Sequence, residues 1–144
     1  MRYGWHDNPE MWQSAAQAIR GLNWSRHPLH MGYSNSIPVA SGIYVMTLTA
    51  AHLLDTAVIW EKLQAPMYIG KSDNLQVRFK QHLRGQAGTK DLIYNFPRLT
   101  FWYTKVNEPE MSRVEAVLIT VFGPSVNQIQ PISLRARILP PVPA

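Results

Sequence analysis

The sequence of 144 residues contains no cysteine. A disulfide framework and a thiolate zinc site are therefore excluded, and the composition suits a reducing cytoplasm, where we expect the protein to reside. Long apolar runs are also lacking, since no stretch approaches the roughly 18 residues of a membrane-spanning helix. The first residues carry no apolar segment of the signal-peptide kind. We therefore expect no association with a membrane.

Charged residues are scarce, at 16%, while apolar residues make up 46% of the chain. These proportions are typical of a globular protein, and the length suits one domain. The whole net charge of +5 falls within residues 71–105. The charged residues of that segment are Lys71, Arg78, Lys80, Arg84, Lys90, Arg98 and Lys105, opposed only by Asp73 and Asp91. Two interpretations stay open: a surface for a polyanion such as nucleic acid, or a solvated basic face that maintains solubility.

Capping residues, apolar periodicity and β-branched runs define six expected elements. These are helices at 9–20, 74–84 and 107–122, and strands at 41–49, 67–71 and 99–106. Residues 22–40 are rich in turn-forming residues, so we expect a loop there. Residues 50–65 are compatible with a helical turn or with a strand extension. The order of elements predicts a mixed α/β (α+β) domain with a small sheet.

The last expected helix carries a carboxylate on its apolar face. Met111, Val114 and Leu118 form one stripe at about 100° per residue, and Glu115 falls within it. A carboxylate on such a face is costly unless a cation, a metal or a hydrogen-bond donor meets it. Periodicity therefore favours a functional carboxylate over a glutamate at the rim of the stripe that pairs with a surface Lys or Arg.

The preceding helix has two polar residues one turn apart. Arg78 and His82 border its apolar side, and at a spacing of four positions their side chains cover the same patch. A guanidinium and an imidazole together suit a phosphate. Taken alone, the pair is more typical of an ordinary amphipathic helix. His27 and His30 have the spacing of a metal pair but no acidic or thiolate companion, so we predict a surface loop there.

Two tripeptides on expected strands carry the signature of a family. Gly42-Ile43-Tyr44 lies on the first strand and Tyr68-Ile69-Gly70 on the second, in the order that names the GIY-YIG nuclease superfamily. The chain resembles this superfamily over roughly residues 41–128. Five further positions match its pattern along the chain: Lys71, Arg78, His82, Glu115 and Asn127.

The resemblance implies the GIY-YIG fold, a small three-stranded antiparallel sheet flanked by helices. Residues 41–128 would form the nuclease core. Residues 1–40 would be an N-terminal helix and loop extension that packs on the domain or shapes a substrate groove. Residues 129–144 would be a C-terminal tail. The interval between Tyr44 and Tyr68 is wider than in the smallest members, which implies an insert.

The resemblance also implies hydrolysis of a phosphodiester with one divalent metal. Glu115 would hold Mg²⁺ or Mn²⁺, and Arg78 would clamp the scissile phosphate. Tyr44 and Tyr68 would orient the attacking water, one of them serving as a possible base. A tyrosine is a poor base at neutral pH, so a cation such as Lys71 must lower its pKa.

Other positions would support this chemistry. His82 would hydrogen-bond the phosphate or one tyrosine, and Asn127 would hold the network on the phosphate side in place. The expected partner is DNA, with a duplex favoured. The residues that would meet its backbone are Lys71, Lys80, Arg84 and Lys90.

These features favour a metal-dependent DNA endonuclease of a restriction, defence or mobile-element kind. The alternative is a catalytically inactive binding module with the same fold, which would keep the basic segment but has no reason to keep all of these polar positions. A purely structural interaction protein explains neither Glu115 nor the placement of charge. A homodimer is compatible with these features.

Overall fold

The computed structural model describes residues 9–49, 64–96, 98–124 and 126–127. Its elements follow in the order α1 (Pro9–Ile19), β1 (Ser25–Pro28), the 3-10 helix η2 (Met31–Ser36), β2 (Gly42–Thr49), β3 (Gln64–Ser72), α4 (Leu75–Leu83), α5 (Lys90–Asn95), β4 (Leu99–Lys105) and α6 (Glu110–Phe122). All six expected elements are present, most within a few residues of their predicted ends. The expected C-terminal tail lies outside the described residues.

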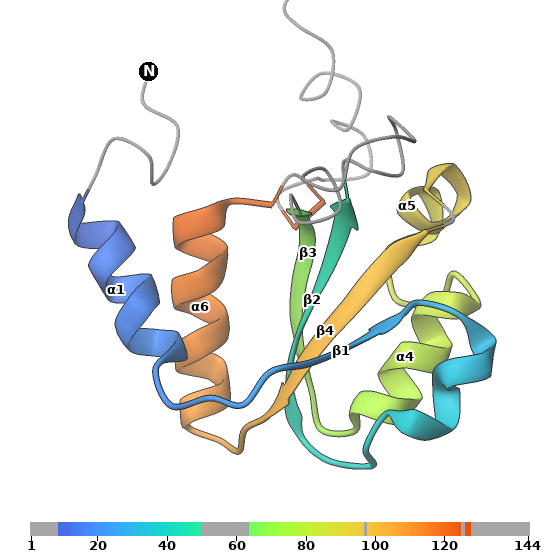
Figure 1. The fold of residues 1–144 in the computed structure, drawn as a ribbon, viewed down its shortest axis with the longest axis horizontal. Helices are drawn as coiled ribbons and strands as arrows, with labels where there is room; N and C mark the ends of the chain where they lie inside the picture. The colour runs from blue at the N-terminus through green and yellow to red at the C-terminus, as the bar shows by residue number, and fades with distance from the viewer. Residues whose placement is uncertain (1–8, 50–63, 97, 125, 128–144) are drawn as a thin grey trace, which may run out of the picture.

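The strands form one antiparallel sheet in the order β1-β4-β2-β3 (Figure 1). The prediction of three strands is therefore wrong, because β1 comes from the segment expected to be a loop. Three of its four residues are polar, the fourth is a proline, and most are exposed, so they carry no apolar alternation. Pairing with β4 holds this strand, and Arg26 lies over the Trp102 ring at 5.2 Å.

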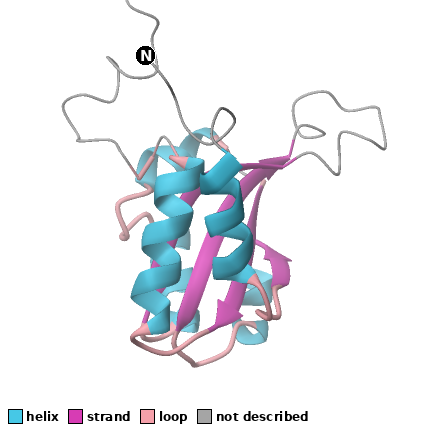
Figure 2. Ribbon diagram, turned by 90° about the vertical axis from the view of Figure 1, so that its left-hand side faces the viewer, coloured by secondary structure: helices cyan, strands magenta, loops and turns pink. Residues whose placement is uncertain are grey.

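Helices cover both faces of the sheet. Helices α1 and α6 lie on one face, and α4, η2 and α5 lie on the other (Figures 1 and 2). Alternation along β2 sends Tyr44 and Met46 into the core beneath α4, while Ile43 packs in the core beneath α6. The sheet therefore separates two hydrophobic cores, and β3 is one of its edge strands.

Local signals set the ends of the two helices that flank β3. Asn74 caps α4 by accepting a hydrogen bond from the Val77 amide at 3.1 Å. Gly123 ends α6 in the left-handed conformation at φ 50°, and its amide donates to the Ile119 carbonyl at 2.8 Å. These signals are local, which is why the sequence predicted both helices.

Candidate active site

The two tripeptides lie side by side on neighbouring strands. Strands β2 and β3 pair so that Tyr44 is opposite Gly70. A Cβ atom on Gly70 would collide with the Tyr44 phenol, so this glycine lets the ring lie across β3. The Tyr68 ring stacks on that of Tyr44 with centroids 6.0 Å apart. Gly42 is also needed for a close approach, because a Cβ atom there would collide with the Thr104 carbonyl oxygen on β4.

Tyr44 belongs to a buried chain of hydrogen bonds. Its hydroxyl oxygen lies 2.8 Å from Nε2 of His82, whose Nδ1 lies 2.6 Å from Oγ1 of Thr89. Arg78 and Tyr68 also hydrogen-bond the Tyr44 side chain. Tyr44, His82 and Thr89 are each no more than 1% exposed. The cluster therefore joins β2, β3, α4 and the residue that precedes α5.

Burial dominates the ionisation of Tyr44. Desolvation raises its pKa far above the usual value, the neighbouring Tyr68 adds to the effect, and Arg78 opposes it only in part. The expectation that a nearby cation brings a tyrosine pKa below its usual value is wrong for Tyr44, because burial outweighs the effect of the cation. Arg78, and not Lys71, is the cation that acts on it. Tyr68 is partly exposed, so it is the tyrosine of this pair that a substrate can reach.

His82 is a neutral ring in the core. Burial, followed by the positive charge of Arg78, lowers its pKa to about 3. Both ring nitrogens are engaged, one by Tyr44 and one by Thr89. Of the two roles implied for His82, the structure contains the contact with a tyrosine. The expectation that His82 lies at the polar edge of its helix is wrong, because its helical position falls among Leu75 and Phe79 on the buried side.

Glu115 lies on the opposite face of the sheet, on α6, and is half-buried. Burial raises its pKa, and the nearby charge of Glu108 adds to this. Lys71 lowers it through its charge and through its backbone N–H, which donates to the carboxylate, and the charge of Arg78 also lowers it. Arg78 therefore acts electrostatically on both Tyr44 and Glu115 across the edge of the sheet.

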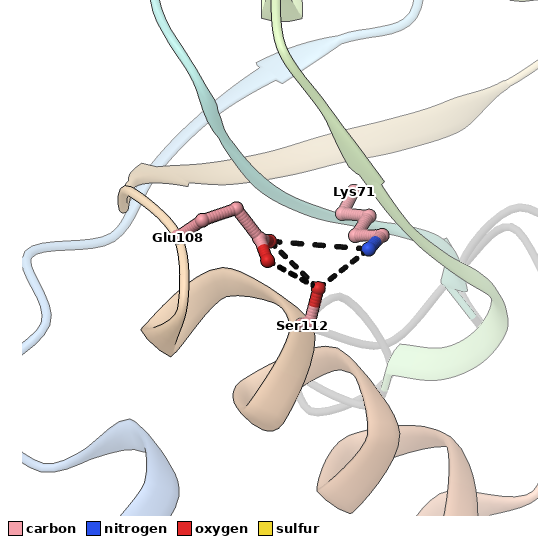
Figure 3. A network of polar contacts seen from close by, with 3 residues as sticks. All are labelled: Lys71, Glu108 and Ser112. Atoms are coloured by element: carbon pink, nitrogen blue, oxygen red, sulfur yellow. Dashed lines mark hydrogen bonds and ion pairs between the residues drawn. The ribbon is translucent and has the colours of Figure 1, made fainter.

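The Lys71 side chain is held on the α6 face. Its Nζ donates to Oγ of Ser112 at 2.5 Å and lies 3.9 Å from the Glu108 carboxylate (Figure 3). The Ser112 hydroxyl in turn donates to that carboxylate, with oxygen distances of 2.6 and 2.7 Å. The lysine and the glutamate are roughly half-exposed, so this network is weakly stabilising. It directs Lys71 toward α6 and away from the two tyrosines.

Two predicted site residues contact the backbone of the edge strand β3. Asn127 accepts a hydrogen bond from the Ile69 amide at 2.7 Å and donates to the Ile69 carbonyl at 2.6 Å. Glu115 accepts from the Lys71 amide two residues later. An edge strand leaves such groups unpaired, and pairing them with side chains satisfies the strand. Asn127 and Glu115 therefore also fix the position of β3.

The predicted backbone-binding residues do not share one surface with Arg78. Lys80 follows Arg78 by two positions, about 200° around α4, and Arg84 lies one turn beyond Lys80. Both point away from the core side of the helix. Lys90 begins α5, where Tyr94 lies one turn later with 86% of its surface exposed. Lys90 and Tyr94 together offer a cation and an open aromatic ring.

A cavity of about 350 Å³ lies elsewhere, between the sheet and the helices α1 and α6. It is lined mainly by apolar side chains, among them Trp24, Trp102 and Phe122. None of the seven predicted site residues lines it. The chemistry-bearing groups gather at the edge of the sheet, so the candidate site is the polar region around β3 and not this apolar cavity.

Sequence reasoning missed three residues that contact the candidate site. Glu108 and Ser112 are spaced by four at the start of α6, a spacing that brings side chains together and could have identified them. Alternation along β3 could also have placed Lys71 on the face opposite Tyr68. Thr89 carries no such signal, because its partner His82 is seven residues away across a turn.

Comparisons with protein-family models, with curated proteins and with solved structures give no match for this chain. In the described part of the chain, no helix is long and apolar enough to cross a membrane.

Proposed function

We propose that this protein is a divalent-metal-dependent endonuclease of the GIY-YIG type, with duplex DNA as its substrate. One observation carries the proposal: Tyr44, Tyr68, Arg78 and His82 meet in one cluster, and Glu115 lies across β3 within electrostatic reach of the same arginine. Four elements contribute these five side chains. Packing alone gives no reason for a fully buried tyrosine, a neutral histidine and a desolvated carboxylate to adjoin one guanidinium.

The carboxylate fits a hard cation that retains most of its water. Glu115 is half-buried with its pKa raised, so an added positive charge beside it is favourable. Within the residues that the structure describes, no three His, Cys, Asp or Glu side chains gather as a complete metal cage. Mg²⁺ and Mn²⁺ need only one or two carboxylates. Glu115 would hold such an ion, which supplies Lewis-acid activation of the phosphate.

The chain's own residues have separable roles in this proposal. The Arg78 guanidinium donates to the scissile phosphate and stabilises the charge that develops on its oxygens in the transition state. The partly exposed Tyr68 hydroxyl hydrogen-bonds and orients the attacking water. Tyr44 and His82 do not touch the substrate, because neither has exposed surface, and they hold Arg78 and Tyr68 in place.

A second candidate function is a nucleic-acid-binding module without catalysis. The observation that favours it is the burial of Tyr44, which raises the pKa of a residue that the family resemblance assigns to the attacking water. In this alternative, the basic residues and Tyr94 would bind DNA, and the cluster around Tyr44 would be structural.

Nicking of supercoiled plasmid DNA separates the two candidates. The wild-type protein is incubated with plasmid in Mg²⁺, in Mn²⁺ and in excess chelator. Metal-dependent nicking that the chelator abolishes supports the endonuclease. Stable binding without nicking in either metal would support the binding module and reject the enzyme.

A further inference from the structure

Thr89 occupies the position at which a threonine normally caps a helix, but its side chain does something else. It is the residue before α5, and its hydroxyl makes no capping hydrogen bond. The hydroxyl instead lies 2.6 Å from Nδ1 of His82. Thr89 is 1% exposed, so water does not compete for this contact. The capping interaction that α5 forgoes is replaced by a bond to the candidate site.

The direction of that bond follows from counting donors and acceptors around Thr89. Its hydroxyl has one proton to donate, and among the described residues the acceptor within reach is Nδ1 of His82. A buried hydroxyl proton without an acceptor is costly, so Thr89 donates and Nδ1 accepts. Nε2 of His82, 2.8 Å from the Tyr44 oxygen, then donates to it.

The number of protons on the imidazole decides which ring nitrogen accepts. The pKa of His82, at about 3, leaves the ring with one proton at neutral pH. If Nε2 carries that proton, Nδ1 is an acceptor. The Thr89 hydroxyl is then its donor, and this also satisfies a buried hydroxyl for which the structure shows no other acceptor among the described residues.

We propose that Thr89 is a positioning residue for the nuclease reaction: its hydroxyl holds His82 as the Nε2–H tautomer, and His82 then donates to Tyr44. The catalytic importance of this residue rests on the proposed function, whereas the tautomer does not. The two bonds of the chain run from Thr89 through His82 to Tyr44. The Tyr44 ring, held in this way, stacks on that of Tyr68, the tyrosine that a substrate can reach.

The tautomer is measured directly by nitrogen NMR of the ¹⁵N-labelled wild-type protein at neutral pH, with no substrate or metal present. The shifts and couplings of a neutral imidazole identify the protonated nitrogen. We expect His82, assigned by its loss in His82→Gln, to be protonated at Nε2. Protonation at Nδ1 would overturn the inference whether or not the protein cuts DNA.

Kinetics test the positioning role. Thr89→Val keeps the shape and removes the donor, and we expect kcat for plasmid nicking to fall by about tenfold with KM little changed. Thr89→Ser restores the hydroxyl and should recover most of kcat. Thr104→Val removes a buried threonine hydroxyl on β4 and is the matched control, with kcat unchanged.

These experiments distinguish failure of the inference from failure of the proposed function. An Nε2–H tautomer in a wild-type protein that never nicks DNA would reject the nuclease and leave the tautomer assignment standing. Equal kcat for Thr89→Val and wild type would reject the positioning role. If Thr89→Val does not fold, the Thr89→Ser kinetics and the wild-type tautomer still decide, since a serine that fails to support turnover contradicts the proposal.

Discussion

The polar groups on the two sides of strand β3 differ most in their contact with water. On the α4 side, Tyr44, His82 and Thr89 are almost completely buried, and burial is the largest cause of the pKa shifts of Tyr44 and His82. On the α6 side, Lys71 and Glu108 remain roughly half-exposed although they form a connected network with Ser112. Similar hydrogen bonds therefore have different energetic weight on the two sides.

This difference in burial predicts different roles for the two groups of residues: the buried side positions other side chains, and the exposed side contacts the substrate. A buried chain cannot rearrange without leaving an unpaired polar group, so it fixes the geometry of Arg78 and Tyr68. An exposed network exchanges its partners with water at little cost, so Lys71 can leave Glu108 when a phosphate arrives. We expect substitutions on the α4 side to damage both fold and turnover, and substitutions in the exposed network to affect mainly binding.

Among the substitutions that leave some activity, the largest expected effect is that of Arg78, the residue that acts on both sides. Arg78→Ala should lower kcat by a factor of about 10² or more, because the lost guanidinium acts on charge that develops in the transition state. Binding of DNA should weaken less. Single-turnover nicking at saturating protein measures this, with the exposed Arg98→Ala as the control. A collapse in affinity with unchanged single-turnover cleavage would make Arg78 a docking contact only.

A pair of substitutions compares the stability of the two sides. His82→Leu leaves the buried Thr89 hydroxyl without its partner and removes one partner of the Tyr44 hydroxyl, and should lower the free energy of unfolding by about 2 to 4 kcal/mol. Ser112→Ala, in the exposed network, should change it by less than about 0.5 kcal/mol. Urea denaturation of both variants measures the difference. Comparable losses would mean that burial does not distinguish the two sides.

The pH dependence of stability isolates His82. Its pKa is lowered from 6.5 to about 3 in the folded protein, so between these values the unfolded chain binds a proton that the folded chain does not. The contribution of the His82 pKa shift to the free energy of unfolding is complete above pH 6.5 and is lost as pH falls toward 3. The slope should reach about 1.4 kcal/mol per pH unit for this one proton.

Urea titrations between pH 7.5 and about 5, near the unperturbed histidine pKa, test this slope. The control is His82→Gln, which removes the ionisable group while the other histidines remain. The stability advantage of the wild type over His82→Gln should shrink as pH falls, because only the wild type loses the contribution of His82. Parallel pH profiles would show that His82 titrates normally in the folded state.

The sequence predicted the elements of the core because their signals are local. Asn74 and Gly123 mark helix ends, and the two tripeptides mark neighbouring strands. It missed β1 because a polar strand is defined by its partner β4 and not by its own pattern. It also missed α5, whose six residues are too few to show helical periodicity.

The sequence indicated which residues form the candidate site, but not whether each side chain is buried or exposed. The resemblance selected Arg78, His82 and Glu115, and the fold brings them to one region around β3. Whether a side chain is buried depends on what packs over it, and α4 places His82 in the core. The role implied for Lys71 therefore changed once its contacts were known, whereas His82 kept its implied contact with a tyrosine. Thr89 emerged only from the three-dimensional arrangement.

The smallest expected effect concerns the basic residues outside the cluster. Lys80 and Arg84 point away from Arg78, so a duplex bound at β3 should contact few of them. Each lost phosphate contact reduces the slope of log K against log salt by about 0.9. Replacing Lys80, Arg84 and Lys90 by Gln should flatten the slope by about one unit or less. A change near three units would place the DNA path across α4 and α5.

The central claim is that Glu115 holds a catalytic metal beside Arg78, in addition to pairing with the Lys71 amide. The most direct measurement is Mg²⁺-dependent plasmid nicking by wild type, Glu115→Gln and the matched control Glu110→Gln, an exposed glutamate on the same helix. A glutamine keeps the shape and an oxygen acceptor for the Lys71 amide, so the fold should survive. We predict nicking by wild type and Glu110→Gln and none by Glu115→Gln, with DNA affinity retained. Wild-type nicking by Glu115→Gln in Mg²⁺ would contradict the account.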